Sequence, residues 1–200
     1  MNTDNLTGIK RYSDQNKISP DNTKLTPKID KYLFTGFETV LLNKQLSGLI
    51  HCPITANGNY TVPETVTAIG IEAFSQCKGL TSILFPTSLK SIACLAFENC
   101  IRLTSITLPC SIVEMGYRVF LNCTGLKSIN VQSKDPLKLR IDSEVFYNVD
   151  KNCCILNVPF GSKKNYQQSD QWKEFKNIVE NEIFLLSSTK VEIRNSNLEN

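Results

Sequence analysis

The chain has 200 residues, 41% of them hydrophobic, and a formal net charge of +3 at pH 7. This length and apolar content suffice for one domain with a continuous core. Because the charge is mild, composition alone does not indicate nucleic-acid binding. No apolar stretch reaches the roughly 18 residues that a membrane-spanning helix needs, so we expect no membrane span.

The two ends of the chain differ from its middle in composition. Residues 1–31 are polar and show no hydrophobic period, which predicts a disordered N-terminal arm. The first residues lack the basic start and apolar stretch of a signal peptide, and we expect none here. Residues 181–200 are expected to form a C-terminal extension, in which 183–194 could add a strand.

A phenylalanine returns every 23 residues, at Phe74, Phe97 and Phe120, and a cysteine follows each one three residues later. A fourth unit, ending at Phe146, is stretched to 26 residues by a loop around 133–137. A fixed period of this length is typical of a solenoid, in which each repeat buries its apolar side against its neighbours. We therefore expect the phenylalanines to stack as one buried column.

Each repeat contains a pattern that predicts one short strand. In Leu103, Ile106 and Leu108, the last two apolar residues are separated by one outward position, and Pro109 follows. Proline lacks an N–H and ends the strand. Equivalent strands then stack into a parallel sheet at about 4.8 Å per step.

The unit Leu80-Thr-Ser-Ile-Leu-Phe-Pro, continuing to Ala96-Phe97-Glu-Asn-Cys100, resembles the BspA-like (Treponema-type) leucine-rich repeats. The resemblance covers about residues 32–180, and Val149 departs from it where cysteine is expected. It implies an α/β repeat solenoid, a right-handed superhelix with one short parallel strand per 23-residue repeat and a small helical C-terminal cap. The implied parts are an N-terminal hairpin (32–62), repeats (60–158) and a cap (159–180).

Local signals support both ends of this arrangement. Asn57-Gly58 lies between two apolar runs and predicts a hairpin turn. Ser162 is positioned to cap a helix that begins after Gly161. Trp172 is expected to cover the apolar end of the last repeat, with stacking on a ligand as the alternative.

The eight cysteines are predicted to be thiols rather than a disulfide framework, although at least one disulfide stays open as an alternative. Cys77, Cys100 and Cys123 share one repeat position, where a free cysteine behaves as a small hydrophobic residue. Strand alternation favours Cys154 or Cys52 as the exposed thiol. No C-x-x-C occurs and His51 is the only histidine, so we expect no metal site and no cofactor.

The chain offers few residues for catalysis. A nucleophile activated by histidine would need His51, which lies in a predicted strand. Asp135, Asp142 and Glu144 could bind a cation weakly, but a solvated loop is the favoured interpretation. No glycine-rich phosphate loop is present, so we expect no enzyme.

The outward residues of the predicted strands form the candidate partner-binding surface. By alternation these residues are Thr81, Ser82, Leu84, Thr104, Ser105, Thr107, Lys127, Ser128 and Asn130. They predict a flat, polar, concave face, which either keeps the sheet soluble or contacts a protein or glycan. The loop 133–140 is the second candidate.

The sequence favours a non-catalytic binding module, and the resemblance implies cell-surface or secreted adhesion and recognition. The alternative is an intracellular, cytoplasmic scaffold, in which eight unpaired cysteines would be natural. A third, less favoured hypothesis is an enzyme that uses an exposed cysteine. We expect a monomer that binds a protein or glycan of unknown identity, and no nucleic acid.

Overall fold

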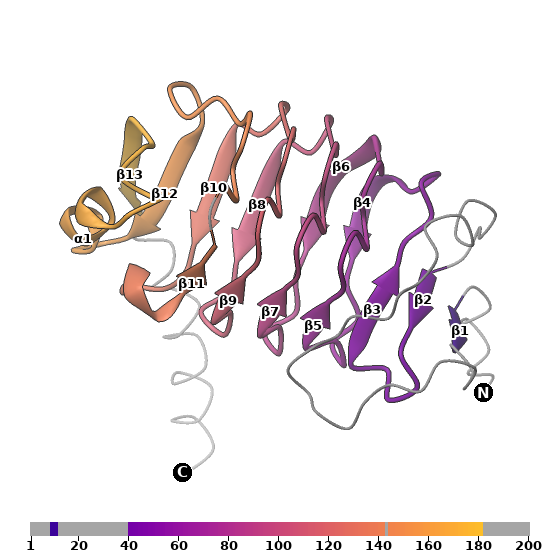
Figure 1. Ribbon diagram of the computed structural model, residues 1–200. Helices are drawn as coiled ribbons and strands as arrows, with labels where there is room; N and C mark the ends of the chain where they lie inside the picture. The colour runs from indigo at the N-terminus through magenta and orange to yellow at the C-terminus, as the bar shows by residue number, and fades with distance from the viewer. Residues whose placement is uncertain (1–8, 12–39, 143, 182–200) are drawn as a thin grey trace, which may run out of the picture.

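The computed structural model describes residues 9–11, 40–142 and 144–181, which wind into a solenoid with strands on two sides (Figure 1). One side is a six-stranded parallel sheet in the order β13-β12-β10-β8-β6-β4. Its strands are β4 (Asn57–Thr61), β6 (Gly79–Leu84), β8 (Ser105–Leu108), β10 (Ser128–Val131), β12 (Ile155–Pro159) and β13 (Asn177–Asn181). The predicted repeat fold and its parallel sheet are confirmed.

The other side carries a second sheet of seven shorter strands, in the order β1-β2-β3-β5-β7-β9-β11. These strands are β1 (Ile9–Arg11), β2 (Val40–Leu42), β3 (Gly48–His51), β5 (Ala68–Ile69), β7 (Ser91–Ile92), β9 (Glu114–Met115) and β11 (Arg140–Ile141). A middle repeat therefore contributes two strands, where the sequence predicted one. The second strand is only two residues long, and a single buried side chain such as Ile92 gives no alternation to detect.

The N-terminal hairpin is formed by β2 and β3, which pair antiparallel. Asn43 closes its turn, because its side-chain Oδ1 accepts hydrogen bonds from the backbone N–H groups of Ser47 at 2.8 Å and Gly48 at 3.0 Å. The hairpin turn predicted at Asn57-Gly58 is wrong. Both residues belong to β4, which pairs parallel with β6, and Gly58 has a φ of +74°.

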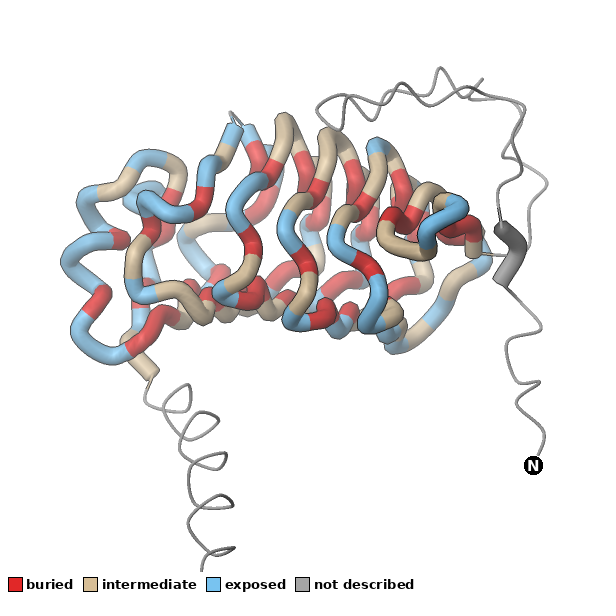
Figure 2. The backbone as a smooth tube through the Cα atoms, turned by 90° about the horizontal axis from the view of Figure 1, so that it is seen from below, coloured by how far each residue is buried: buried red, intermediate tan, exposed pale blue. Residues whose placement is uncertain are grey.

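The phenylalanines form the predicted column between the two sheets. Phe74, Phe97, Phe120 and Phe146 are each at most 1% exposed. Successive ring centroids are 4.8, 5.3 and 5.5 Å apart, with planes inclined by 15° or less. Figure 2 shows the buried positions recurring from turn to turn along the solenoid. The column ties each repeat to the next.

Two residues in each repeat turn have left-handed backbone conformations. The first set is Glu72, Leu95, Arg118 and Glu144, and the second is Gln76, Asn99, Asn122 and Asn148, all with φ between 53° and 65°. Asparagine tolerates this conformation better than most residues. The side chains also form a ladder, because Asn122 donates to Asn99 at 2.8 Å and Asn148 donates to Asn122 at 2.7 Å.

The insertion contains a 3₁₀ turn, η1 (Pro136–Lys138), and the C-terminal cap contains one helix, α1 (Lys163–Gln168). Ser162 is the N-cap residue of α1, but its side chain makes no capping bond; its hydroxyl donates to the Pro159 carbonyl instead. Trp172 is 1% exposed, with its ring centroid 5.6 Å from that of Phe146, so the packing interpretation is confirmed. Most of 1–31 and 182–200 lies outside the described residues.

Candidate functional site

The six-stranded sheet brings the predicted binding residues together on its outer side. Ser82, Ser105 and Ser128 are aligned in register across β6, β8 and β10, and Thr107 is aligned with Asn130. We call the outward side chains of this sheet the strand face. Its members are Asn57, Asn59, Thr61, Thr81, Ser82, Leu84, Thr104, Ser105, Thr107, Lys127, Ser128, Asn130, Ile155, Asn157, Asn177 and Val179. All of them are exposed or half-buried.

Side-chain hydrogen bonds run across neighbouring strands of the strand face. The Asn157 amide donates to Asn130 at 2.9 Å, and the Asn130 amide donates to the Thr107 hydroxyl at 3.2 Å. Near the other end, the Ser82 hydroxyl donates to Asn59 at 2.7 Å. These bonds orient the amides, so the face is ordered before any partner arrives. Asn59 was not among the predicted residues, because the hairpin prediction placed its segment elsewhere.

The strand face carries no carboxylate among its members, and Lys127 is its only charged member. Exposed apolar side chains lie toward its two ends: Leu84 is 59% exposed on β6, and Ile155 and Val179 are 41% and 46% exposed on β12 and β13. Apart from Lys127 at the start of β10, the middle of the face is therefore uncharged and rich in hydrogen-bonding groups. Such a surface suits contacts with backbone, amide or hydroxyl groups of a partner.

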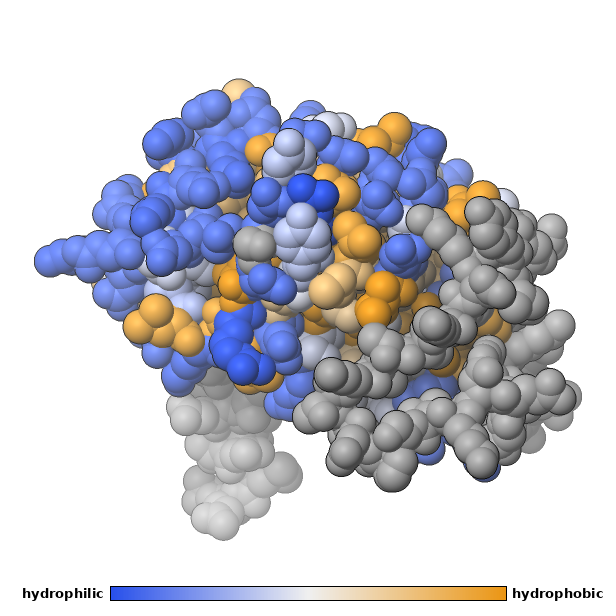
Figure 3. Space-filling model, in the orientation of Figure 1, coloured by the Kyte–Doolittle hydropathy of each residue, from blue (hydrophilic) through white to orange (hydrophobic). Residues whose placement is uncertain are grey.

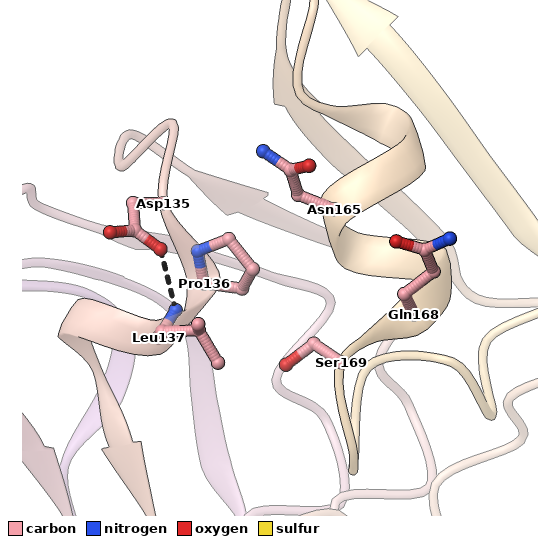
Figure 4. Close-up of a pocket in the computed structure, with 6 residues that line it drawn as sticks. All are labelled: Asp135, Pro136, Leu137, Asn165, Gln168 and Ser169. Carbon is pink, nitrogen blue, oxygen red and sulfur yellow. Dashed lines mark hydrogen bonds between the residues drawn. The ribbon is translucent and has the colours of Figure 1, made fainter.

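The insertion and the cap together line a small hollow of about 290 Å³ (Figure 4). Its lining residues are Asp135, Pro136, Leu137, Asn165, Gln168 and Ser169. Asp135 accepts a hydrogen bond from the Leu137 N–H at 2.9 Å, which holds the 3₁₀ turn. The Tyr166 hydroxyl donates to the Ser133 carbonyl at 2.7 Å and ties the insertion to α1. The loop is thus anchored to the cap.

A cluster that the sequence reading missed lies on the repeat turns. The guanidinium carbon of Arg118 lies 4.8 Å from the ring centroid of Tyr117 and 5.1 Å from that of Tyr147. Its Nε donates to Glu144 at 2.7 Å, and Tyr117 also donates to Glu144, at 3.0 Å. These two bonds lower the pKa of the Glu144 carboxyl, with Arg118 the larger cause. The sequence feature that could have revealed this contact is the 26-residue spacing of Arg118 and Glu144, which equals the length of the fourth unit and places the two residues at equivalent positions of neighbouring repeats.

The burial of the cysteine side chains agrees with the prediction for the three repeat cysteines and differs from it for the two thiols predicted to be exposed. Cys77, Cys100 and Cys123 are buried as expected, and Cys100 and Cys123 donate to the carbonyls of Phe74 at 3.2 Å and Phe97 at 3.1 Å. Cys52 and Cys154, predicted as the exposed thiols, are both buried. The exposed ones are Cys110 and Cys153. Cys154 directly precedes β12, in which Leu156 and Val158 are buried and Ile155 is exposed, so Cys154 lies on the inward side of that alternation.

The acidic residues that could have formed a cation site are not grouped around one position. Glu144 is bound to Arg118 and Asp135 holds the 3₁₀ turn, so the two do not share a cation site. Within residues 40–142 and 144–181, no three His, Cys, Asp or Glu side chains are grouped as metal ligands would be. His51 is half-buried in β3, and burial lowers its pKa. No helix of the described residues could span a membrane.

The BspA type leucine rich repeat region matches residues 52–179 in six copies. The chain belongs to this family. Membership supports a repeat-based interaction module, a class that is typically non-catalytic. No curated protein matches the chain.

Solved structures of bacterial leucine-rich repeat proteins resemble this one. A leucine-rich repeat protein from Eubacterium ventriosum is 26% identical, with a TM-score of 0.49 over 61% of this chain and 32% of that chain. The pneumococcal vaccine antigen PcpA is 18% identical, with a TM-score of 0.44 over 73% of this chain and 47% of that chain. TpLRR of T. pallidum is 15% identical, with a TM-score of 0.48 over 78% of this chain and 93% of that chain. The chain thus spans less than half of the first two proteins.

Proposed function

We propose that this chain is a non-catalytic recognition module that works at a cell surface or outside the cell. It binds a protein or glycan through the strand face. The observation that carries the proposal is the uncharged middle of that face, where the row Ser82, Ser105 and Ser128 lies beside hydrogen-bonded Thr107 and Asn130. A flat, ordered surface binds with little loss of conformational entropy.

One observation favours an intracellular scaffold as a second candidate. All eight cysteines lie in the described residues and none is in a disulfide, which would suit a reducing compartment. In both cases the strand face is the proposed contact surface. The two candidate functions differ only in the compartment, outside or inside the cell, in which the chain binds its partner.

Variants of the folded chain test the surface. Partners are first sought with a glycan array and a pull-down, and then Ser105→Phe and Thr107→Phe are compared with the unsubstituted chain. Both positions are half-buried on β8, and a bulky neutral ring there would block close approach. We expect binding to weaken at least about tenfold, a change of roughly 1.4 kcal/mol.

Val113→Phe is the matched control, because Val113 is 50% exposed and precedes β9 in the opposite sheet. Circular dichroism and unfolding midpoints show whether each variant is folded. If Val113→Phe weakens binding while the β8 variants do not, the contact surface lies elsewhere. Substrate turnover by the chain would overturn the recognition-module proposal itself.

A further inference from the structure

Basic side chains line the edge of the six-stranded sheet at which its strands begin. Lys78, Lys127 and Lys176 each immediately precede a strand, β6, β10 and β13. Arg102 lies three residues before β8, and Lys151 lies four residues before β12. Because these strands are parallel, their beginnings lie along one edge. In the register of the sheet, Lys127 and Lys176 are at equivalent positions, and Arg102 and Lys78 lie two and three residues further from the strands. We call these five residues the basic edge.

The basic edge places one cation at each of five consecutive strands. At about 4.8 Å between neighbouring strands, the row extends for about 19 Å along the solenoid. Lys78, Arg102, Lys127 and Lys176 are all exposed. None of these four forms an ion pair with a described carboxylate, whereas Lys151 is paired with Glu174 at 2.7 Å. Within the described residues, these four positive charges therefore have no carboxylate paired with them.

Among the residues that the structure describes, carboxylates near this edge are few and mostly engaged. Glu174 pairs with Lys151, and Asp170 pairs with Lys173 at 2.5 Å. Asp150 accepts hydrogen bonds from the backbone N–H groups of Asn152 at 3.0 Å and Cys153 at 3.4 Å. Those donors offset part of its negative charge. The edge keeps a net positive charge along most of its length.

The turns on another side of the repeats have the opposite charge balance. In segments 70–76, 93–99, 116–122 and 142–148, the charged described residues are Glu72, Glu98, Asp142 and Glu144 against the single cation Arg118. Figure 3 also shows how unevenly polarity is distributed, with hydrophilic residues dominating the end that carries α1 and hydrophobic residues gathered toward the middle. A negatively charged ligand would therefore be attracted to the basic edge and repelled by the turns.

The strand face adjoins the basic edge and adds what an anionic sugar chain would need. It carries hydroxyls and amides that can bond to sugar hydroxyls, and it has no carboxylate to repel an anion. We propose that the ligand of this face is an anionic polysaccharide, carrying sulfate or carboxylate groups, that lies along the solenoid with its charges on Lys78, Arg102, Lys127 and Lys176. This inference rests on the proposed function and names the class of partner.

Heparin is the probe that tests the inference, with hyaluronate as a carboxylated probe and dextran as an uncharged one. The edge variant combines Lys78→Gln, Arg102→Gln, Lys127→Gln and Lys176→Gln. The control variant removes the same charge from exposed lysines elsewhere, with Lys90→Gln, Lys134→Gln, Lys138→Gln and Lys164→Gln. All eight side chains are exposed, so both variants should fold with nearly unchanged unfolding midpoints.

We expect the unsubstituted chain and the control variant to bind heparin, and the edge variant to bind about 10–100-fold more weakly at 0.15 M salt. Each lost contact to a polyanion removes about one released counterion, so the slope of log K against log salt should fall by about 3 to 4. Binding of hyaluronate as well would show that carboxylate suffices, and binding of heparin alone would assign sulfate. Either result supports the inference.

Several results would overturn it. These are equal weakening in both variants, no heparin binding by the unsubstituted chain, or equal affinity for polyglutamate or a single-stranded oligonucleotide of matched length. If Ser105→Phe abolishes binding to another partner while the edge variant behaves like the control, the proposed function stands and the anionic glycan is wrong. If Ser105→Phe has no effect on any partner, including heparin, the strand face itself is wrong.

Discussion

The rings of Phe74 and Phe97 stack with their centroids 4.8 Å apart and their planes inclined by 10°. Phe97 also meets the ring of Phe120 at 5.3 Å, so it is held on both sides by neighbouring repeats. This stacking, together with the backbone pairing of the two sheets, links consecutive turns of the solenoid.

We expect Phe97→Ala to lower the free energy of unfolding by about 3–5 kcal/mol, because it removes a fully buried ring and leaves a cavity in the column. Chemical denaturation measures the change. Phe160→Ala is the control, because Phe160 is 55% exposed and should cost less than about 0.5 kcal/mol. A loss below about 1 kcal/mol at Phe97 would contradict the column's role.

The thiols should fall into two classes in the native protein. We expect a thiol reagent to label exposed Cys110 and Cys153 quickly and to reach Cys77, Cys100 and Cys123 only after unfolding. The hydrogen-bonded thiol of Cys123, and then burial, raise the pKa of Cys100, which further suppresses its thiolate. Mass spectrometry after timed labelling identifies the modified residues.

Reductant offers an independent check on the same prediction. If the buried cysteines are thiols, the unfolding midpoint should be nearly the same with and without reductant. A native disulfide typically contributes about 2–5 kcal/mol, so a large drop in the midpoint on reduction would show that one had formed.

The pKa of Glu144 should depend on Arg118. The Arg118 guanidinium, and then the Tyr117 hydroxyl, lower this pKa below the usual value of 4.5. A lowered carboxyl pKa in the folded state adds stability above the unfolded pKa, and that stability is lost as the pH falls through the folded pKa. Arg118→Gln should therefore raise the pKa of Glu144 and flatten the loss of stability below about pH 4.5.

A carboxyl-carbon NMR titration measures this pKa directly. Arg102→Gln is the control, since Arg102 lies on the basic edge and is not bonded to Glu144. The interpretation of the cluster would fail if Arg118→Gln left the Glu144 titration unchanged, or if both variants shifted it equally.

The contact between the insertion and the cap is testable through Tyr166. Its buried hydroxyl donates to the Ser133 carbonyl at 2.7 Å. Tyr166→Phe removes that donor while keeping the ring, and we expect a loss of about 1–3 kcal/mol, because the carbonyl loses its partner. Thermal or chemical denaturation measures it. An unchanged stability would mean that the bond does not hold the insertion in solution.

The sequence predicted the parts of the fold that depend on the repeat. The 23-residue spacing placed Phe74, Phe97 and Phe120 in one column, and the same register aligned Ser82 with Ser105. Both follow from stacking identical units, since equivalent residues then lie side by side. The outward residues of the candidate face could be predicted for the same reason.

Features that break or fall outside the period were harder to predict. Asn57-Gly58 has a strong local turn signal, but pairing of β4 with β6 overrides it. In the repeat register Cys154 falls at the outward position of Lys127, but the turn before β12 places it on the buried side with Leu156. The link between Arg118 and Glu144 joins two repeats of unequal length, which the pattern within one repeat could not reveal.

The most direct test of the binding surface is an NMR map of backbone amide shifts when the partner is added to the folded chain. The proposed function predicts that the largest shifts fall on the strand face, centred on Ser105, Thr107, Ser128 and Asn130. Shifts concentrated at Val113 and Glu114 in the opposite sheet, or around the hollow at Asp135 and Leu137, would contradict it.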